Sequence, residues 1–182
     1  MLRFPVPDIV VGSVFDITPE FLAAHDVELL LLDLDNTIAT YAEQYPSRKL
    51  KDRVNLLSES GVRLYIVSNN KGNRPERFAK MLGIGYIKSA KKPLTAETRK
   101  LLVKLDADIK KTALVGDQIF TDVLCARRIG IISIVVTPID MKNPLIMTRY
   151  FLERPFRWAY EMRRKKIGKN GKNPEIAGDG KY

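Results

Sequence analysis

Residues 29–37 read LLLLDLDNT: four leucines, two aspartates separated by a fifth leucine, and a polar turn. A continuous apolar run that ends in a turn is typical of a strand in a parallel sheet, because such a sheet is covered on both faces. Asp33 and Asp35 then lie at the carboxyl end of the strand, where open α/β sheets bind their ligands. Side chains two residues apart on a strand point the same way, so one carboxylate can act as a nucleophile while the other moves a proton.

The sequence from residue 27 onward alternates short β-rich runs with longer helical patterns. Strands are predicted at 27–35, 63–70, 84–90, 112–117 and 130–136. Helices are predicted at 47–60, 75–82, 95–105 and 121–129, the second with proline in its first turn and the last stopping at Gly130. This alternation predicts a doubly wound, Rossmann-like α/β domain, a three-layer sandwich with a central parallel sheet.

The composition fits one globular domain, since 45% of the 182 residues are hydrophobic and 29% are charged. Cys125 is the single cysteine and cannot form an internal disulfide, which indicates a reducing compartment and favours a buried structural thiol. His25 is the single histidine, which disfavours a His-based metal site or triad. The apolar runs fall well short of the roughly 20 residues that span a membrane, so a cytoplasmic protein is expected.

Basic residues are concentrated near the C-terminus. Between residues 142 and 172, ten Lys or Arg residues face two Glu residues, so this segment carries +8 of the net +10, whereas residues 1–141 carry +3 and the last ten −1. We therefore expect an enzyme-like domain over 1–140 and a basic aromatic helical extension over 141–167 that packs on or near the core. Residues 168–182, which are rich in Gly, Lys and Asn, are expected to form a mobile tail.

Three further polar segments follow the strands in order. Ser68 closes the second strand in YIVSNN, Lys92 precedes Pro93 in KKP, and GDQIFTD at 116–122 follows the fourth strand. Taken alone, Ser68 and Lys92 are weak signals, because Ser-Asn-Asn is usually a turn and Lys-Lys-Pro a solvated loop. Together with DLDNT, their order and spacing resemble the four signatures of the haloacid dehalogenase superfamily.

The resemblance implies the reaction. Asp33 would attack phosphorus and form an aspartyl-phosphate, and Asp35 would be the general acid and base. In this superfamily an acid two residues after the nucleophile marks phosphatases and phosphomutases. A leaving alkoxide needs a proton and the acyl-phosphate then needs an activated water, so one carboxylate can serve both steps.

The resemblance also implies the residues around the phosphoryl group. Ser68 and Asn69 would bind it, and Lys92 would neutralise nucleophile and phosphate, with Lys91 as the less favoured alternative. The implied cofactor is Mg²⁺, a hard cation that takes oxygen ligands. Its implied ligands are Asp33, Asp35 through its backbone carbonyl, Asp117, and Asp122 either directly or through water.

The spacing of the signatures leaves no room for a cap. Residues 36–68 hold only a loop and one helix before the second strand ends, and residues 69–91 are equally short, so we expect an essentially capless enzyme that accepts a large substrate. The spacing, with SVFDITPEFL at 13–22 and NPLIMTRYFLERP at 143–155, resembles the subfamily IIIA group called the YqeG family.

The resemblance to this group implies a substrate. A eukaryotic relative of the group is a mitochondrial phosphatidylglycerophosphatase, so the implied reaction converts phosphatidylglycerol phosphate to phosphatidylglycerol. Aromatic and basic residues alternate between 149 and 166, a composition that suits peripheral contact with the anionic inner face of a membrane.

Three alternatives remain open. The aromatic residues can pack on the core while the cations face water. The substrate can be a soluble sugar or nucleotide phosphate. Less expected is a protein with a vestigial site that binds RNA or the ribosome. The sequence leaves the oligomeric state open.

Overall fold

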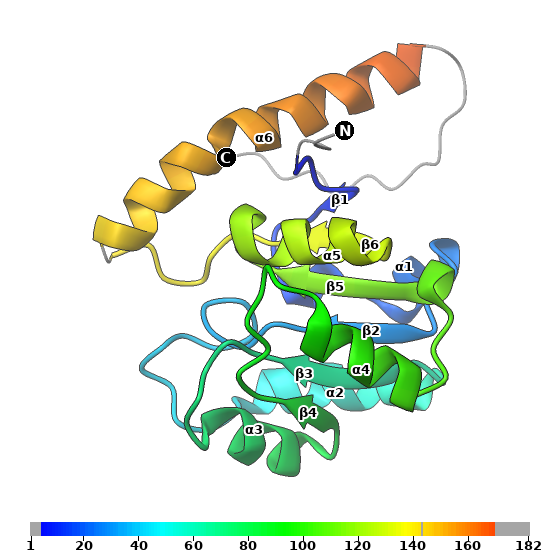
Figure 1. Ribbon diagram of the computed structural model, residues 1–182, viewed down its shortest axis with the longest axis vertical. Helices are drawn as coiled ribbons and strands as arrows, with labels where there is room; N and C mark the ends of the chain where they lie inside the picture. Colours follow the sequence, from blue (N-terminus) through cyan, green and yellow to red (C-terminus); the bar gives the residue numbers. More distant parts are fainter. Residues whose placement is uncertain (1–4, 143, 170–182) are drawn as a thin grey trace.

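A computed structural model describes residues 5–142 and 144–169. Its centre is a six-stranded sheet in which every pairing is parallel, in the order β1-β6-β5-β2-β3-β4 (Figure 1). The strands are β1 (Ile9–Val10), β2 (Leu29–Leu32), β3 (Arg63–Val67), β4 (Gly85–Ile87), β5 (Thr112–Gly116) and β6 (Ile132–Val135). The predicted parallel α/β architecture is confirmed.

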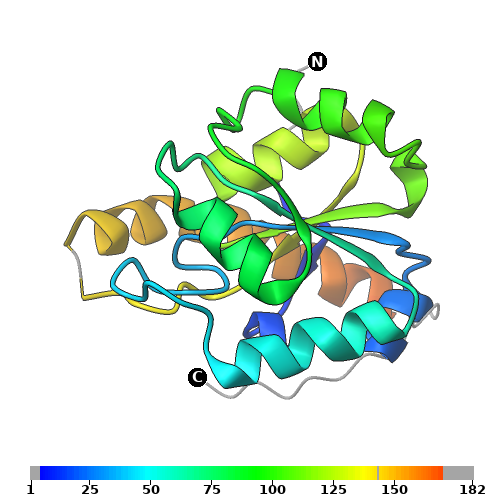
Figure 2. The same cartoon turned by 90° about the horizontal axis from the view of Figure 1, so that it is seen from below.

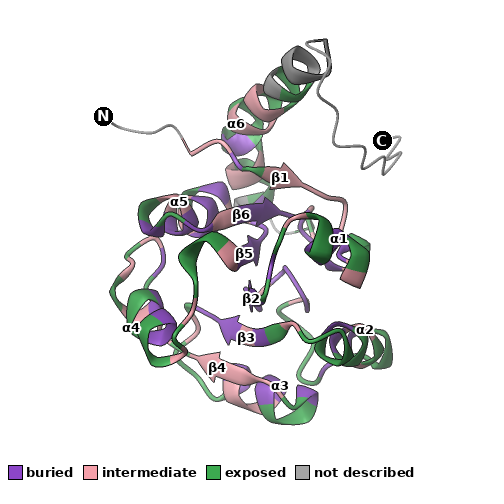
Figure 3. Cartoon of the chain, turned by 90° about the vertical axis from the view of Figure 1, so that its right-hand side faces the viewer, coloured by how far each residue is buried: buried purple, intermediate pink, exposed green. Residues whose placement is uncertain are grey.

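Helices cover both faces of the sheet, because the leucines of β2 alternate between them. Leu30 and Leu32 belong to the core on one face, and Leu29 and Leu31 to the core on the other. The first face is covered by α1 (Pro19–Ala24), α2 (Arg48–Glu59) and α3 (Arg74–Leu82), and the second by α4 (Ala96–Lys104) and α5 (Leu124–Ile129) (Figure 3). The three predicted layers are therefore present.

The helix ends follow local signals in the sequence. Ser47 Oγ accepts a hydrogen bond from Leu50 N at 3.2 Å and so caps the start of α2. Gly83 and Gly130 have φ of 67° and 97°, the left-handed conformation that ends α3 and α5. The predicted boundaries of α2, α3 and α4 agree with the structure to within one residue.

β1 is a strand that the sequence did not predict. It is two residues long and pairs Ile9 with Ile134 at the edge of the sheet. The carboxylate of Asp8 accepts hydrogen bonds from Ser133 N at 3.0 Å and Ser133 Oγ at 2.7 Å. The apolar run at 9–11 is only three residues long, too short to predict a strand, so its place depends on these tertiary contacts.

The carboxyl ends of the central strands lie beneath loops rather than beneath a lid domain. Only a loop separates β2 from α2, and only α3 with its flanking loops separates β3 from β4 (Figure 2). Short single-turn elements fill the remaining connections: η1 (Val14–Asp16), η2 (Ile109–Lys111) and the π-helix η3 (Ile119–Val123). The prediction of an essentially capless fold is confirmed.

The last described element is α6 (Pro144–Lys169), a single helix with Pro155 inside it. It contacts β1 and η3 at the edge of the sheet. Figures 1 and 2 show its first turns beside the loop after β2, at the end of the sheet where the central strands finish. None of the described helices has the length and apolar character that crossing a bilayer requires. The predicted division at residues 140 and 167 stays a prediction, and the predicted tail from residue 170 lies outside the described residues.

Candidate active site

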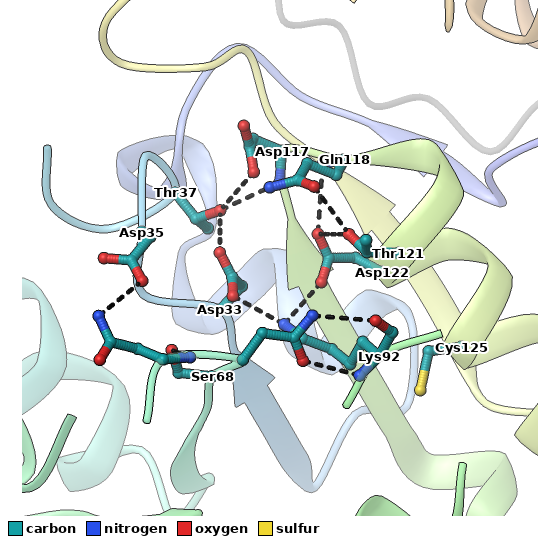
Figure 4. Close-up of polar contacts among 12 residues, drawn as sticks. Asp33, Asp35, Thr37, Ser68, Lys92, Asp117, Gln118, Thr121, Asp122 and Cys125 are labelled. Carbon is teal, nitrogen blue, oxygen red and sulfur yellow. Dashed lines mark hydrogen bonds and ion pairs between the residues drawn. The ribbon is translucent and has the colours of Figure 1, made fainter. Parts of the chain in front are cut away.

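Two carboxylates from neighbouring strands meet through a threonine. Asp33 follows β2 and Asp117 follows β5, and the parallel pairing of these strands brings both to one edge of the sheet. Thr37 Oγ1 donates to Asp33 Oδ2 at 2.9 Å, accepts from Asp117 N at 3.0 Å and lies 3.4 Å from Asp117 Oδ1 (Figure 4). Thr37 was not among the predicted site residues, although it belongs to the DLDNT segment. Its hydroxyl sets the spacing of the two carboxylates.

Lys92 reaches the same point from the loop before α4. Its Nζ lies 2.7 Å from Asp33 Oδ1 and 2.7 Å from Asp122 Oδ1, and its side chain is buried, whereas the alternative residue Lys91 is exposed. Asn69 holds the backbone of Lys92 in place: its Nδ2 donates to Lys92 O at 2.9 Å and its Oδ1 accepts from Lys92 N at 2.7 Å. The Asn69 amide thus positions Lys92, and its contact with phosphate stays a prediction.

The ammonium of Lys92 remains charged in these surroundings. Burial acts to lower the pKa of Lys92, but the carboxylates of Asp122 and Asp33 outweigh burial and raise the pKa. A fixed cation in a site that excludes water interacts strongly with developing negative charge. Lys92 can therefore neutralise charge on an attacking carboxylate or on a phosphoryl oxygen.

Asp122 reaches the cluster from the π-helix η3. Its Oδ2 accepts from Gln118 N at 3.2 Å. A Cβ placed on Gly116 would overlap the carboxyl group of Asp122, so the glycine at the end of β5 is what permits the approach. Irregular π-helical turns are frequent at functional sites, and here the turn aims a buried carboxylate at Lys92.

The donor set fits a divalent cation. Asp33, Asp117 and Asp122 are all buried, and each offers an oxygen within 4.8 Å of those of the other two. Burial, with the charges of Asp33 and Asp122, raises the pKa of Asp117 to about 8. Three crowded carboxylates of this kind are the ligands that Mg²⁺ favours. Among the described residues, the carboxylate of Asp35 does not belong to this cluster of three. The role of its backbone carbonyl as a metal ligand stays a prediction.

Asp35 turns toward an arginine that sequence reasoning missed. Its Oδ1 forms an ion pair with Arg74 Nη1. The same guanidinium donates to Thr40 O at 2.5 Å and to Glu43 O at 3.0 Å. Arg74 therefore joins Asp35, the proposed general acid and base, to the loop after β2. It comes from the first turn of α3, where an arginine alone does not predict a site residue.

Ser68 lies at the end of β3 and is fully buried. Its Oγ accepts from Asn70 N at 3.1 Å, and Asn70 Nδ2 lies 3.4 Å from Asp35 Oδ2. The predicted site residues thus form two linked groups on one edge of the sheet. Asp33 and Asp122 contact Lys92 directly, and Asp117 is joined to Asp33 through Thr37. Asp35 and Ser68 are joined through Asn70.

Helix α6 contributes three residues that sequence reasoning did not assign to the site. Arg149 Nη2 lies 3.1 Å from Asp117 Oδ2. Glu153 Oε1 accepts from Ile119 N at 2.9 Å, and Arg157 Nη2 donates to Asp117 O at 3.1 Å. The four-residue spacing, which places all three on one helical face, was visible in the sequence, but the loop that this face contacts was not.

Three carboxylates and a buried lysine lie at the carboxyl edge of a capless parallel sheet, and together with the family matches of the chain they identify a phosphatase of the haloacid dehalogenase type. A family model described as mitochondrial PGP phosphatase matches residues 2–139. The chain belongs to this family. It is also 32% identical over 148 residues to Probable phosphatase YqeG of Bacillus subtilis (strain 168), a match that covers 81% of this chain and 86% of that protein.

Solved structures share the fold at low sequence identity. An uncharacterized protein from Listeria monocytogenes serotype 4b is 18% identical, with a TM-score of 0.51, and the match covers 65% of this chain and 85% of that one. The cobalt-bound deoxy-D-mannose-octulosonate 8-phosphate phosphatase of Haemophilus influenzae is 12% identical, with a TM-score of 0.50 and coverage of 75% and 92%. These similarities establish the fold of the chain.

Proposed function

We propose that the protein is a Mg²⁺-dependent phosphomonoesterase that converts phosphatidylglycerol phosphate to phosphatidylglycerol. The observation that carries the proposal is the convergence of Asp33, Asp117 and Asp122 with Lys92 around one point. This arrangement can hold a metal ion and a phosphoryl group against one nucleophile. The family match over residues 2–139 supports the choice of substrate.

In the first half-reaction, a carboxylate oxygen of Asp33 attacks phosphorus. The bond from phosphorus to the alkoxide breaks, Asp35 gives its proton to the leaving oxygen, and an aspartyl-phosphate forms. Lys92, 2.7 Å from Asp33 Oδ1, holds the nucleophile and offsets negative charge as the two groups approach. Ser68, which lies at the end of β3, donates a hydrogen bond from its hydroxyl group to a phosphoryl oxygen.

In the second half-reaction, Asp35 takes a proton from water while the water oxygen attacks the same phosphorus. The bond to Asp33 breaks, which releases inorganic phosphate and restores the carboxylate. In both steps the ion pair with Arg74 holds the Asp35 carboxylate next to the loop after β2. Mg²⁺ held by Asp33, Asp117 and Asp122 would supply charge neutralisation on the phosphoryl oxygens.

The outward face of α6 suits a substrate embedded in a membrane. We call the residues of this face the outer stripe: Met147, Phe151, Arg154, Trp158 and Met162. Its apolar members are each at least 42% exposed, and their spacing places them opposite the face that contacts the metal loop. Exposed aromatic and apolar side chains next to cations favour an anionic lipid surface.

The test is an assay of phosphate release in mixed micelles. The parent protein with Mg²⁺ should hydrolyse phosphatidylglycerol phosphate with a higher kcat/KM than glycerol 3-phosphate, and chelation of the metal should remove the activity. Good turnover of soluble sugar or nucleotide phosphates without turnover of the lipid would replace the substrate. Salt-sensitive RNA binding that survives Asp33→Asn, in a parent without phosphatase activity, would replace the whole proposal.

A further inference from the structure

Arg149 lies on the solvent side of the metal cluster. Its guanidinium contacts Asp117 Oδ2 at 3.1 Å, whereas Asp117 Oδ1 faces Thr37 at the interior of the site. The Arg149 side chain is 29% exposed, and the side chain of Asp117 is fully buried. Arg149 therefore lies between the buried carboxylate of Asp117 and solvent.

Tyr41 shares this position from the loop after β2. Tyr41 is 50% exposed. Burial raises the pKa of Tyr41, as do the negative charges of Asp117 and Asp33, whereas the charge of Arg149 acts to lower it. Arg149 and Tyr41 therefore form a polar rim on one side of the site.

Arg149 is not needed to hold α6 in place. Glu153 accepts from Ile119 N, and Arg157 donates to the carbonyls of Asp117 and Val136 at 3.1 Å and 3.2 Å. These contacts use backbone groups of the loop, so binding of a metal ion leaves them intact. The contact of Arg149 is different, because it uses the carboxylate of a proposed metal ligand.

The net charge of the cluster indicates a role for the Arg149 guanidinium in binding an anion. With all three carboxylates ionised, the cluster together with Lys92 and Arg149 has a net charge of −1. A bound divalent cation would change this net charge to +1. A divalent cation held by Asp117 would repel the guanidinium that lies 3.1 Å from Asp117 Oδ2, which favours release of the Arg149 side chain from this contact. An arginine released in this way binds phosphate oxygens through two parallel hydrogen bonds.

We propose that Arg149, with Tyr41, binds a second anionic group of the substrate, the phosphodiester that links the headgroup to its glycerol backbone. This inference rests on the proposed function, because phosphatidylglycerol phosphate carries that phosphodiester next to the terminal phosphate and a simple sugar phosphate does not. Arg149 lies in α6, beyond residue 139, where the match to the family model ends.

Two soluble probes isolate the second anionic group from any effect of a membrane. Glycerophosphoglycerol phosphate, the deacylated headgroup, has both phosphates, and glycerol 3-phosphate has only the terminal one. Arg149→Met should raise KM for the first probe about tenfold or more relative to the second, since only the first probe loses a charge-assisted hydrogen bond to its phosphodiester. Arg149→Lys, which keeps the charge and loses the fork, should fall between parent and Arg149→Met. Arg164→Met, which removes the same charge from an exposed position on the same helix, should leave the ratio at its parent value.

Calorimetric titration with Mg²⁺ separates this role from a structural one. Arg149→Met should bind Mg²⁺ at least as tightly as the parent, because a competing cation has been removed. A tenfold loss of Mg²⁺ affinity, with KM raised equally for both probes, would show that Arg149 only orients Asp117 and would overturn the inference. A parent that hydrolyses both probes, with a KM ratio that Arg149→Met does not change, would overturn the inference and leave the phosphatase assignment standing. A parent that hydrolyses neither probe nor the lipid would remove both.

Discussion

Asp117 is contacted both by the loop after β2 and by helix α6. Thr37 and Arg149 approach its carboxylate, and Arg157 donates to its carbonyl. With its pKa raised to about 8, Asp117 holds a proton at neutral pH in the metal-free protein. In the unfolded chain the same carboxyl ionises near pH 4. Between these values the folded state binds the extra proton, so Asp117 lowers the stability of the metal-free protein as pH rises from about 4 to about 8.

Metal affinity should change with pH in the opposite sense. A ligand carboxylate must lose its proton, so binding of Mg²⁺ should release about one proton near pH 7 and strengthen by roughly tenfold per pH unit up to about pH 8. Calorimetry in buffers of different ionisation enthalpy measures the released proton directly. An affinity that is flat between pH 6 and pH 8 would contradict the raised pKa of Asp117.

At the residue scale, sequence reasoning found the groups that follow strands and missed those that approach from helices. Asp33, Ser68 and Asp117 each follow an apolar run, and parallel strands end at one edge, so their convergence could be predicted. Arg74 and Arg149 come from helices whose orientation relative to the sheet is set by packing. No local sequence pattern predicts that packing, so neither arginine could be assigned to the site from the sequence.

At the scale of elements, the π-helix η3 and α6 form one unit. Glu153 is 1% exposed, and its Oε1 accepts from Ile119 N at 2.9 Å, with Phe120 N at 3.4 Å. The two amides face a helix rather than water, so α6 satisfies the backbone of the turn that carries Asp122. The position of α6 is thereby linked to the geometry of the metal ligands.

Removal of this carboxylate should weaken both the fold and the metal site. Glu153→Ala leaves buried amides without an acceptor, so the free energy of unfolding should fall by about 1–3 kcal/mol, and Mg²⁺ affinity should fall with it. Urea unfolding and calorimetry measure the two effects. Glu161→Ala removes the same charge from an exposed position on the same helix and should change stability by less than about 0.5 kcal/mol. Equal losses in the two variants would show that Glu153 acts only through its charge.

Most elements could be predicted because their signals are local. Ser47, Gly83 and Gly130 mark helix ends, and the strands of the predicted sheet coincide with β-rich runs. β1 could not be predicted, since two residues carry no period and their place is fixed by Asp8 and Ser133, which are 125 positions apart in the sequence. The π-helix at 119–123 has no local signal either, because it is selected by the contacts of Asp122 and Glu153.

At the scale of the whole molecule, the first turns of α6, which carry Met147 and Phe151 of the outer stripe, lie at the end of the sheet where the site is open (Figures 1 and 2). The capless domain leaves the carboxyl edge of β2 and β5 beneath loops, and the first turns of α6 stand beside it (Figure 2). A protein that docks through the outer stripe would keep its site next to the lipid surface.

Vesicle co-sedimentation tests this docking. The double variant Phe151→Ala/Trp158→Ala should bind vesicles that contain phosphatidylglycerol about tenfold or more weakly than the parent, because two exposed aromatic side chains no longer insert. Leu94→Ala/Val103→Ala removes exposed apolar side chains outside α6 and serves as the matched control. Binding that is unchanged in the first variant, or as strong to neutral phosphatidylcholine vesicles, would argue against the outer stripe as an anionic lipid surface.

The central claim, that Asp33 becomes phosphorylated, is tested most directly by transfer of a labelled phosphoryl group. Asp35→Asn is the variant to use with Mg²⁺ and p-nitrophenyl phosphate, since this leaving group needs no proton and only the second half-reaction is slowed, by about 10²–10⁴-fold. Acid quenching and peptide mapping should then find the label on Asp33, and the double variant Asp33→Asn/Asp35→Asn should carry none. A label on any other residue, or rapid turnover by Asp33→Asn, would contradict the account.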